Sequence, residues 1–566
     1  MARFTSGVLF PAPARWPRLS PPFNAQHIIM LHITPTSSCT FPSSAAESSA
    51  KAAARESGVA RHRLLARCGA SLLSVVALTL GGILTSCAGT STPDGTAPVA
   101  IPAPAPARAP YSTRDHQLDL DSFEVVWTTI RDKHWDPTLG GLDWQAVHDE
   151  LRPKVEQASS RHAARSIMTD MVHRLKQSHF NIVPASAYDS EEIEDSDDQA
   201  VVTNDTARSP AVPANSNEPK VAENSSPPQK PRSERSPGEG ATGIDLRILE
   251  GKAVVTRVTP GSPADVAGVK TGWIISRIDG ASTETRFDRV GNAYAESTMR
   301  AYYMVASVLG ELSGGIGDDV EIEFIDGGDT PITRHITLGP LEGTPARFGN
   351  LPTTYVTIDS RRLPQNIHYF RLSIFFDPPK LSQQLGDAVR GAADADGFII
   401  DLRGNPGGIG GLAAGVAGWF VSQPSLKLGT MYTRSGSLNF NVNPRLNGYR
   451  GPLAVLIDGM SASTSEVLAG GVKDIGRARI FGTQSAGAAL PSVFEVLPNN
   501  DRFQYAMANY ISASGQALEG VGVTPDEVVT LDRQSLLAGK DAVLDAAITW
   551  IESQKNALKP ASESSK

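Results

Sequence analysis

Three serines stand within five residues of one another, at Ser461, Ser463 and Ser465, where a strand is expected to turn into a helix. The apolar run 453–457 predicts a buried strand, and apolar residues recurring at helical spacing over 467–472 predict a helix. A serine at such a junction can project into a cleft, where free N–H groups at the helix N-terminus stabilise a developing oxyanion. The alternative is a serine that only caps the helix. This segment alone does not decide between them.

A second candidate element is the loop Asp-Leu-Arg-Gly-Asn-Pro-Gly-Gly at residues 401–408, which follows an apolar run at 397–400. It is not a phosphate-binding loop, because no Gly-Lys-Ser/Thr follows the glycines. Backbone N–H groups presented close to a nucleophile would instead form an oxyanion hole.

A serine nucleophile also needs a base within hydrogen-bond reach. His179 lies where a helical pattern gives way to a short apolar stretch, but a lone histidine is more often structural or solvated. Other histidines with equal or weaker local claims are His116, His134, His148, His162, His173, His335 and His368.

Composition excludes several classes of protein. The 566 residues correspond to about three domains, and 20% charged with 40% hydrophobic residues is typical of a soluble globular protein with polar linkers. A net charge of -8 gives no reason to expect nucleic acid as a partner. All three cysteines lie in the first hundred residues, so the folded part offers no disulfide framework or cysteine-rich metal site. No metal and no organic cofactor is predicted.

The N-terminal hundred residues contain an export signal. A basic segment, a short apolar core and small residues follow one another over residues 59–87, and the apolar core is too short to span a membrane. The segment ends in Leu-Thr-Ser-Cys and resembles the lipobox of bacterial lipoproteins, which implies a lipid anchor on Cys87; an ordinary signal peptide is the alternative. Residues 1–58 are interpreted as a non-native or disordered extension, and 88–115 as a Pro/Ala-rich spacer. The expected location is the periplasmic face of the membrane, with the outer membrane favoured.

The middle of the chain has three parts. Residues 116–186 are expected to be helical, and 187–240 form an acidic, Pro/Ser-rich insert expected to be disordered. Residues 241–340 contain Ser-Pro-Ala at 262–264 and Ala-Gly at 267–268, and they resemble a PDZ domain. That resemblance implies that Thr242, Gly243 and Ile244 hold the terminal carboxylate of a bound peptide. Trp273 stands where the family usually has an acidic residue, and a structural β-domain with an idle groove is the alternative.

The last part alternates apolar strands and helices over residues 350–550, which predicts an α/β layer structure, with a disordered tail at 551–566. The 401–408 motif, followed by Ser-Ala-Ser-Thr-Ser-Glu at 461–466, resembles the carboxyl-terminal processing (tail-specific) serine peptidases. The resemblance implies a crotonase-like core, with the nucleophile at Ser463. It also implies oxyanion donors at Gly408, Gly407 and Thr464.

Members of that family differ in their base. Many use a lysine, but Ala488 occupies the lysine's place here. Tricorn-like members use a histidine and a glutamate, which correspond to His179 and Glu519, although Gln177 replaces an acidic residue often found before the Ser-His pair. Glu466 is the alternative third member, and it is expected instead to support the turn or cap its helix. In a Ser-His-Glu triad the carboxylate orients the imidazole and stabilises its cation.

The sequence therefore predicts an α/β protein with a crotonase-like core, an inserted, mainly-β PDZ domain and an N-terminal helical segment. Its predicted function is that of an exported, lipid-anchored serine endopeptidase acting on protein or peptide substrates. One alternative is an inactive, peptide-binding adaptor of the same family, and another is a non-proteolytic hydrolase on the same core.

Overall fold

The computed structural model describes residues 111–188, 238–349 and 351–558. The expected extension 1–58, the signal peptide with Cys87, and residues 88–110 of the spacer lie outside the described residues. So do residues 189–237 of the expected insert and 559–566 of the expected tail. Among the helices that are described, none has both the length and the apolar character required to cross a bilayer.

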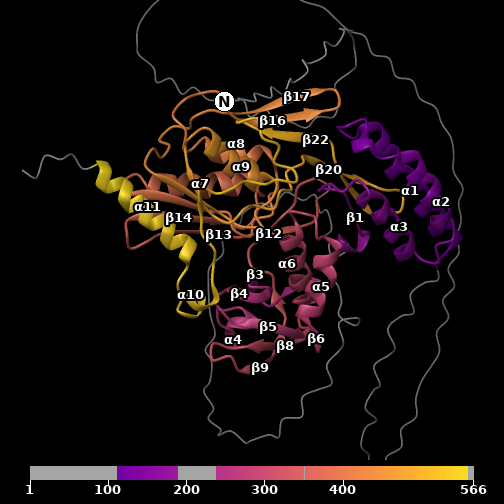
Figure 1. Cartoon of the computed structure of the whole chain (residues 1–566), viewed down its shortest axis with the longest axis horizontal. Coiled ribbons are helices and arrows are strands. Elements are labelled where there is room, and N and C mark those ends of the chain that lie inside the picture. The colour runs from indigo at the N-terminus through magenta and orange to yellow at the C-terminus, as the bar shows by residue number, and fades with distance from the viewer. Residues whose placement is uncertain (1–110, 189–237, 350, 559–566) are drawn as a thin grey trace, which may run out of the picture. The chain divides into compact units, whose positions relative to one another are not determined.

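A six-stranded sheet organises the C-terminal half, with strand order β13-β14-β15-β18-β19-β23 (Figure 1). All neighbouring pairs are parallel except β13 with β14. The strands are β13 (Ile358–Arg362), β14 (Ile367–Leu372), β15 (Gly397–Asp401), β18 (Leu453–Ile457), β19 (Arg479–Gly482) and β23 (Glu527–Val528). Every residue of β15 and β18 is buried, as expected for central parallel strands covered on both faces. The sheet confirms a mixed α/β fold.

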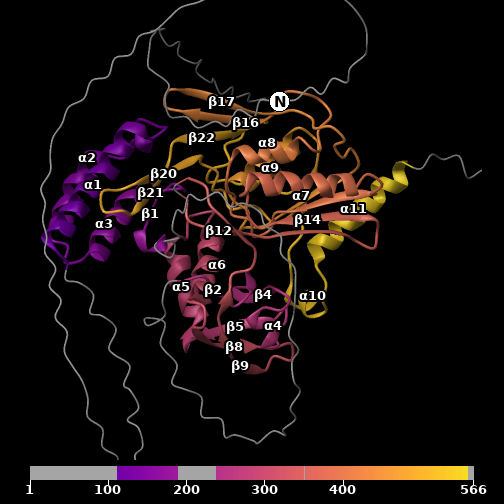
Figure 2. The ribbon, with the colours of Figure 1, turned by 180° about the vertical axis from the view of Figure 1, so that it is seen from behind.

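Helices cover both faces of this sheet (Figures 1 and 2). Apolar residues of α7 (Pro378–Gly391), α8 (Gly411–Ala417) and α9 (Thr464–Asp474) share one hydrophobic cluster with β14, β15 and β18. Helix α11 (Ala542–Leu558) contributes Val543, Ala547 and Ile551 to a cluster with the opposite faces of the same strands. Residues 551–558, expected to be tail, therefore continue this helix, because Ile551 is fully buried against β15.

Residues 238–340 form a second β structure, here called the inserted β-domain. Its main sheet has the order β3-β4-β5-β8-β9, with β6 beside β5, and β3 is an edge strand. The strands are β3 (Ile244–Leu249), β4 (Lys252–Val258), β5 (Ile274–Ile278), β6 (Ala281–Ser282), β8 (Asp319–Ile325) and β9 (Pro331–Thr337). The helices are α4 (Pro263–Val266), α5 (Thr283–Ala293) and α6 (Arg300–Glu311), and α6 contacts β3. A short sheet, β2 (Gly240–Ala241) between β7 (Ser313–Gly314) and β10 (Gly339–Pro340), closes the domain.

Three helices form the N-terminal segment: α1 (Thr113–Lys133), α2 (Trp144–Glu156) and α3 (Arg161–His173). Helix α1 begins at a capping box between Ser112 and Asp115, inside the expected spacer. After α3 the chain forms β1 (Asn181–Val183), which pairs antiparallel with β21 (Arg502–Ala506), itself paired with β20 (Ser492–Val496). Buried residues of the three helices share one cluster with Phe503 and Tyr505 of β21. This strand pairing brings the region around residue 179 to the C-terminal half.

Smaller elements complete the described chain. They are β11 (Thr344–Ala346), β12 (Thr354–Val356), β16 (Leu426–Thr433), β17 (Gly436–Val442), β22 (Ala508–Ser512), α10 (Arg533–Leu537) and the 3-10 turns at Leu139–Gly141 and Ala185–Ala187.

Candidate active site

Ser463 occupies the N-cap of α9, directly after the turn that follows β18. Its backbone has φ 53° and ψ -116°, a strained conformation of the kind found at functional turns. The neighbouring hydroxyls are buried and already engaged: Ser461 Oγ donates to the carbonyl of Leu402 at 2.8 Å, and Ser465 Oγ donates to that of Asn405 at 3.0 Å. Ser463 is the partly exposed member of the three. The geometry therefore favours Ser463 over the two local competitors.

Glu466 holds this turn from inside the protein. Its Oε2 accepts hydrogen bonds from the N–H of Ser463 (3.0 Å) and of Ala488 (2.9 Å). Its Oε1 accepts from Ser485 Oγ (2.6 Å) and the N–H of Gly487 (2.8 Å). Burial raises the pKa of Glu466 to about 7, while these donors act in the opposite direction. Glu466 thus joins the turn of Ser463 to segment 485–488.

The loop after β15 brings Gly407 against Ser463. A Cβ on Gly407 would lie 2.6 Å from Ser463 Cβ, so only glycine fits there, at φ 106°. The N–H of Gly407 donates to Asn405 Oδ1 at 2.8 Å. Gly407 was expected as a possible oxyanion donor, but its N–H group is already used inside the loop. The absence of a side chain at Gly407 instead lets the loop lie close to Ser463.

Gly408 and Thr464 remain as candidate oxyanion donors. Thr464 Oγ1 donates to the carbonyl of Gly408 at 2.8 Å, which ties the loop to the first turn of α9. Within the described part of the chain, neither backbone N–H of this pair has an acceptor. A Cβ on Gly408, at φ 127°, would lie 2.2 Å from the carbonyl oxygen of Phe375. Two free N–H groups flank Ser463, as an oxyanion hole requires.

The predicted base and carboxylate are joined through a third residue. Ser178 Oγ donates to Glu519 Oε2 at 2.8 Å, and the N–H of Ser178 donates to Glu519 Oε1 at 2.7 Å. His179 Nδ1 lies 2.7 Å from the same Ser178 Oγ. The Ser178 hydroxyl uses its only proton in the hydrogen bond to Glu519. Nδ1 of His179 must therefore carry the ring proton and donate a hydrogen bond to Ser178 Oγ. Nε2 is then left with a lone pair, which is the form a general base needs.

The environment keeps His179 neutral. Burial lowers the pKa of His179 to about 4, so the imidazole is uncharged at neutral pH. Burial also raises the pKa of Glu519 above its usual value. The family resemblance predicted His179 and Glu519 as base and carboxylate, but it did not predict that Ser178 lies between them. The only hint of this role in the sequence is that Ser178 directly precedes His179.

One short segment links the two halves of the site. The N–H of Ser463 donates to the carbonyl of Ala488 at 2.8 Å, and the N–H of Ala489 donates to Glu519 Oε2 at 3.0 Å. In the described residues, no hydrogen bond joins Ser463 directly to His179. The methyl group of Ala488 is buried and cannot act as a base. The nearby Lys473 is engaged elsewhere, because its Nζ donates to the carbonyl of Thr524 at 2.6 Å.

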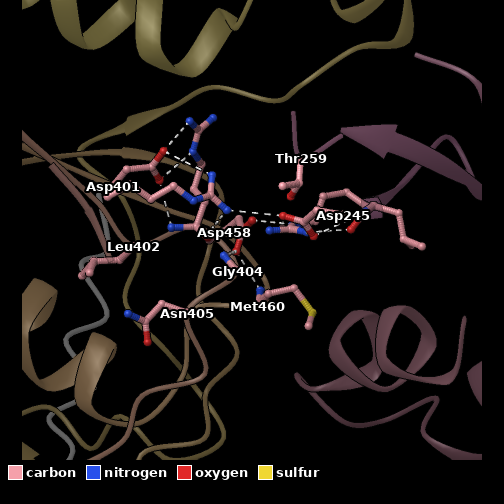
Figure 3. A network of polar contacts seen from close by, with 12 residues as sticks. Asp245, Thr259, Asp401, Leu402, Gly404, Asn405, Asp458 and Met460 are labelled. Carbon is pink, nitrogen blue, oxygen red and sulfur yellow. Dashed lines mark hydrogen bonds and ion pairs between the residues drawn. The ribbon is translucent and has the colours of Figure 1, made fainter. Parts of the chain in front are cut away.

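A buried ionic network lies beneath the turn and reaches the inserted β-domain (Figure 3). Asp458, at the end of β18, accepts from Arg247 Nε of β3 at 2.6 Å. Its other oxygen accepts from the N–H of Gly404 (3.0 Å) and of Met460 (2.9 Å). Arg247 also binds Asp245 Oδ1 at 2.6 Å. One aspartate therefore connects β3 both to the turn before Ser463 and to the loop that carries the glycines.

The network continues into the core sheet. Asp401 binds Arg403 in a bidentate pair at 2.7 and 2.9 Å, and Tyr369 donates to it at 2.7 Å. Burial alone would raise the pKa of Asp401, but Arg403 and Arg371 hold it well below its usual range. Arg403 also pairs with Asp541 just before α11. The loop at 401–408 is therefore held by ion pairs as well as by hydrogen bonds of its backbone N–H groups.

A cavity of about 430 Å³ opens beside this network, between β3, α6 and the core. Its lining includes Ile248 and Val305 from the inserted β-domain and Met460 and Leu531 from the core. The predicted carboxylate-binding residues lie at the start of β3, whereas the cavity lies at its other end. Thr242 is buried, and its Oγ1 accepts a hydrogen bond from the N–H of Ile244 at 3.3 Å. In residues 111–188, 238–349 and 351–558 no three side chains of His, Cys, Asp or Glu are grouped to hold a metal ion.

The fold and the site together define a class: a mixed α/β protein with a serine on a strained strand–helix turn and, from distant segments, a glutamate linked through a second serine to a histidine. Comparison with known families gives a more specific assignment. Residues 366–529 match peptidase family S41, and residues 120–173 match the tricorn protease C1 domain. Over these residues the chain is therefore similar to peptidase family S41.

Proteins with similar sequences are named carboxyl-terminal-processing proteases. The chain is 26% identical over 312 residues to the carboxy-terminal-processing protease of Bartonella bacilliformis, covering 54% of this chain and 64% of that protein. It is 29% identical over 273 residues to the carboxyl-terminal-processing protease of Synechocystis sp., covering 48% of this chain and 57% of that protein. The matches thus span less than two thirds of these relatives. A solved structure of mature CPAF shares the fold, with 12% identity, a TM-score of 0.52 and coverage of 79% of this chain and 99% of that one.

Proposed function

We propose that the chain is a serine endopeptidase of the carboxyl-terminal processing type, with Ser463 as nucleophile and His179 as base. The observation that carries the proposal is the ordered link Glu519–Ser178–His179, which leaves Nε2 as an acceptor. Segment 488–489 connects that link to the turn of Ser463. The family assignment supports a hydrolase acting on peptide bonds.

The reaction follows from these positions. Ser463 Oγ attacks the substrate carbonyl and passes its proton to His179 Nε2, while the N–H groups of Gly408 and Thr464 stabilise the oxyanion. His179 then protonates the leaving amine, and water hydrolyses the acyl-enzyme by the same route in reverse. Glu519, acting through Ser178, stabilises the imidazolium. The direct Ser463–His179 hydrogen bond forms when substrate closes the site, as catalytic hydrogen bonds in unliganded enzymes often do.

The proposal assigns 241–340 to a PDZ domain and 350–550 to a crotonase-like core. An edge strand beside a helix is the arrangement by which PDZ domains add a peptide as a further strand, and β3 with α6 has this arrangement. The cavity between β3, α6 and the core would accept side chains of such a peptide. Substrates are accordingly expected to be proteins or peptides bound through an extended or C-terminal segment.

The proposal also places the enzyme outside the cytoplasm. The signal at 59–87 and the lipobox-like Leu-Thr-Ser-Cys support export and lipidation of Cys87. The substrates would then be exported proteins at the periplasmic face of a bacterial membrane.

The test uses chain beginning at position 87, with Cys87→Ser to remove the anchor, and an unfolded protein as substrate. We expect wild type to cleave it, and Ser463→Ala and His179→Ala to lower kcat by about 10⁴-fold or more. Lys473→Ala is the control that excludes a lysine base, and it should cleave at the wild-type rate. Mass spectrometry of the products would show peptide-bond hydrolysis.

Two results would overturn the proposal. Binding of tail peptides without any cleavage by wild type would support the adaptor, which the alanine at position 488 makes the main competitor. Turnover of activated esters or thioesters without proteolysis would support a hydrolase of another kind on the same core.

A further inference from the structure

We infer that His134, at the end of α1, is a positioning residue that holds the loop of His179 through Gln177. The inference rests on the proposed function, since it concerns how the base is oriented. His134 does not touch the reacting groups. It lies three residues after Arg131 in the helical segment, far in sequence from the other parts of the site.

His134 is buried and fixed on every side. Its ring stacks on that of Trp135 (centroids 5.5 Å apart, 27° between planes) and on that of Phe180 (5.6 Å, 18°). Nδ1 lies 2.8 Å from the carbonyl oxygen and 3.0 Å from the backbone nitrogen of Asp136. The other ring nitrogen, Nε2, lies 3.0 Å from the side-chain amide of Gln177, within hydrogen-bond distance. A histidine with only 1% of its surface exposed therefore directs this ring nitrogen at the residue two positions before His179.

The loop that receives this hydrogen bond is strained. Lys176 has φ 53° and His179 has φ 63°, both in the left-handed region that residues with side chains avoid. Such a backbone conformation persists only where its surroundings impose it. Between these two residues lie Gln177, bound by His134, and Ser178, bound by Glu519. The two anchors hold adjacent residues from opposite ends of the chain.

The anchors have different consequences for catalysis. Glu519 takes part in the charge chemistry through Ser178, whereas His134 contributes only position. Phe180, which stacks on His134, is buried in the cluster of the three N-terminal helices, so His134 ties the loop to that rigid body. Without this anchor, the direction of His179 Nε2 would be less well defined while Glu519 stayed in place. The expected signature is a fall in kcat with KM unchanged.

A matched pair of variants tests this. In His134→Asn the amide oxygen occupies the place of Nδ1 and keeps the Asp136 contact but does not reach Gln177. In His134→Gln the longer amide reaches Gln177. Both lose the aromatic stacking equally. We expect His134→Asn to lower kcat about tenfold, the size of one lost positioning hydrogen bond, and His134→Gln to stay within about threefold of wild type.

Gln177→Leu should match His134→Asn, and the double variant His134→Asn/Gln177→Leu should show no further loss, because both changes remove the same contact. Equal falls in His134→Asn and His134→Gln would mean that only stacking matters. A multiplicative loss in the double variant would mean the two residues act separately. Either result overturns the inference.

Hydrogen–deuterium exchange over residues 174–181 reads the loop without any need for activity. We expect faster exchange in His134→Asn and Gln177→Leu than in His134→Gln and wild type. If wild type shows no peptidase activity, the proposed function fails, yet the exchange pattern still decides whether His134 holds the loop. Unchanged exchange in all variants would overturn the positioning role.

Discussion

The two halves of the candidate site are held in different ways. The nucleophile's turn lies inside the core, where Glu466 alone receives four hydrogen bonds and Asp458 binds a buried arginine and two backbone N–H groups. The base lies on a strained loop held by two side chains, those of Glu519 and His134. Substitutions in the first half should therefore lower both the free energy of unfolding and activity. Substitutions in the second half should lower activity with little change in the free energy of unfolding.

Among substitutions of the residues that support the two halves, Glu466→Gln should have the largest effect. A glutamine has one acceptor oxygen where the carboxylate has two, and its NH₂ group would face N–H donors. We expect kcat to fall by about 10³-fold or more and the free energy of unfolding to fall by about 3 kcal/mol, because buried N–H groups lose their acceptors. Urea unfolding and peptide cleavage would measure both, with exposed Glu150→Gln as control. A wild-type unfolding midpoint would contradict the comparison.

Ser178→Ala tests the base half. Removing the hydroxyl breaks the link between Glu519 and His179, so we expect a fall in kcat of about 10²-fold, in the range of a lost transition-state donor. The free energy of unfolding should change by only about 1 kcal/mol. Ser178→Thr, which keeps the hydroxyl, is the control in the same assays. A stability loss as large as that of Glu466→Gln would remove the distinction between the halves.

Arg247→Met tests whether the inserted β-domain helps to hold the turn of Ser463. It removes the cation shared by the partly buried Asp458 and Asp245, of which Asp245 keeps Arg371, so we expect the free energy of unfolding to fall by about 3 kcal/mol. We expect kcat to fall only about tenfold, because Asp458 keeps its two backbone donors. Thermal unfolding and cleavage rates, with exposed Arg277→Met as control, would measure this. An unchanged midpoint would show that β3 does not support the turn.

The smallest effect concerns pH. As the pH falls through about 7, Glu466 binds a proton and loses acceptor capacity, so kcat/KM should begin to fall there. His179 must be neutral to act, and its pKa of about 4 means that it contributes a second fall only near pH 4. A single acidic limb near pH 6.5 would contradict this assignment.

The same two groups influence stability in opposite directions. The native state keeps a proton on Glu466 between its unfolded pKa and about 7, so this group raises the free energy of unfolding as the pH falls through that range. His179 has a lowered pKa and therefore lowers the free energy of unfolding between its usual pKa and about 4. Denaturation midpoints measured between pH 8 and 6.5 should thus not decline as activity does. A parallel decline would mean that lost activity reflects lost structure.

The nucleophile half was largely predictable from the sequence. The strand, the turn and the helix around Ser463 are local features, and so is the glycine loop after β15, because apolar runs and glycines indicate them directly. Family resemblance added the choice of Ser463 among three serines, and the engaged hydroxyls of Ser461 and Ser465 agree with that choice.

What the sequence did not reveal depends on contacts between distant residues. The role of Ser178 requires knowing where Glu519 lies, 341 positions away, and the use of the Gly407 N–H by Asn405 depends on loop geometry. Arg247 and Asp458 are ordinary charged residues in the sequence, and only the fold places them together. Helix α11 extends beyond its predicted end because Ile551 packs on the sheet, a tertiary contact that local composition does not show.

The pairing of β1 with β21 has a consequence for the nascent chain. The ribosome makes His179 and His134 early, but Glu519 and the strand opposite β1, which also hold this loop, follow more than three hundred residues after His179. At ordinary translation rates that interval lasts tens of seconds. A fragment that ends between helix α9 and residue 519 would contain Ser463 with its helix but would lack Glu519. The candidate site is therefore complete only when synthesis has passed residue 519.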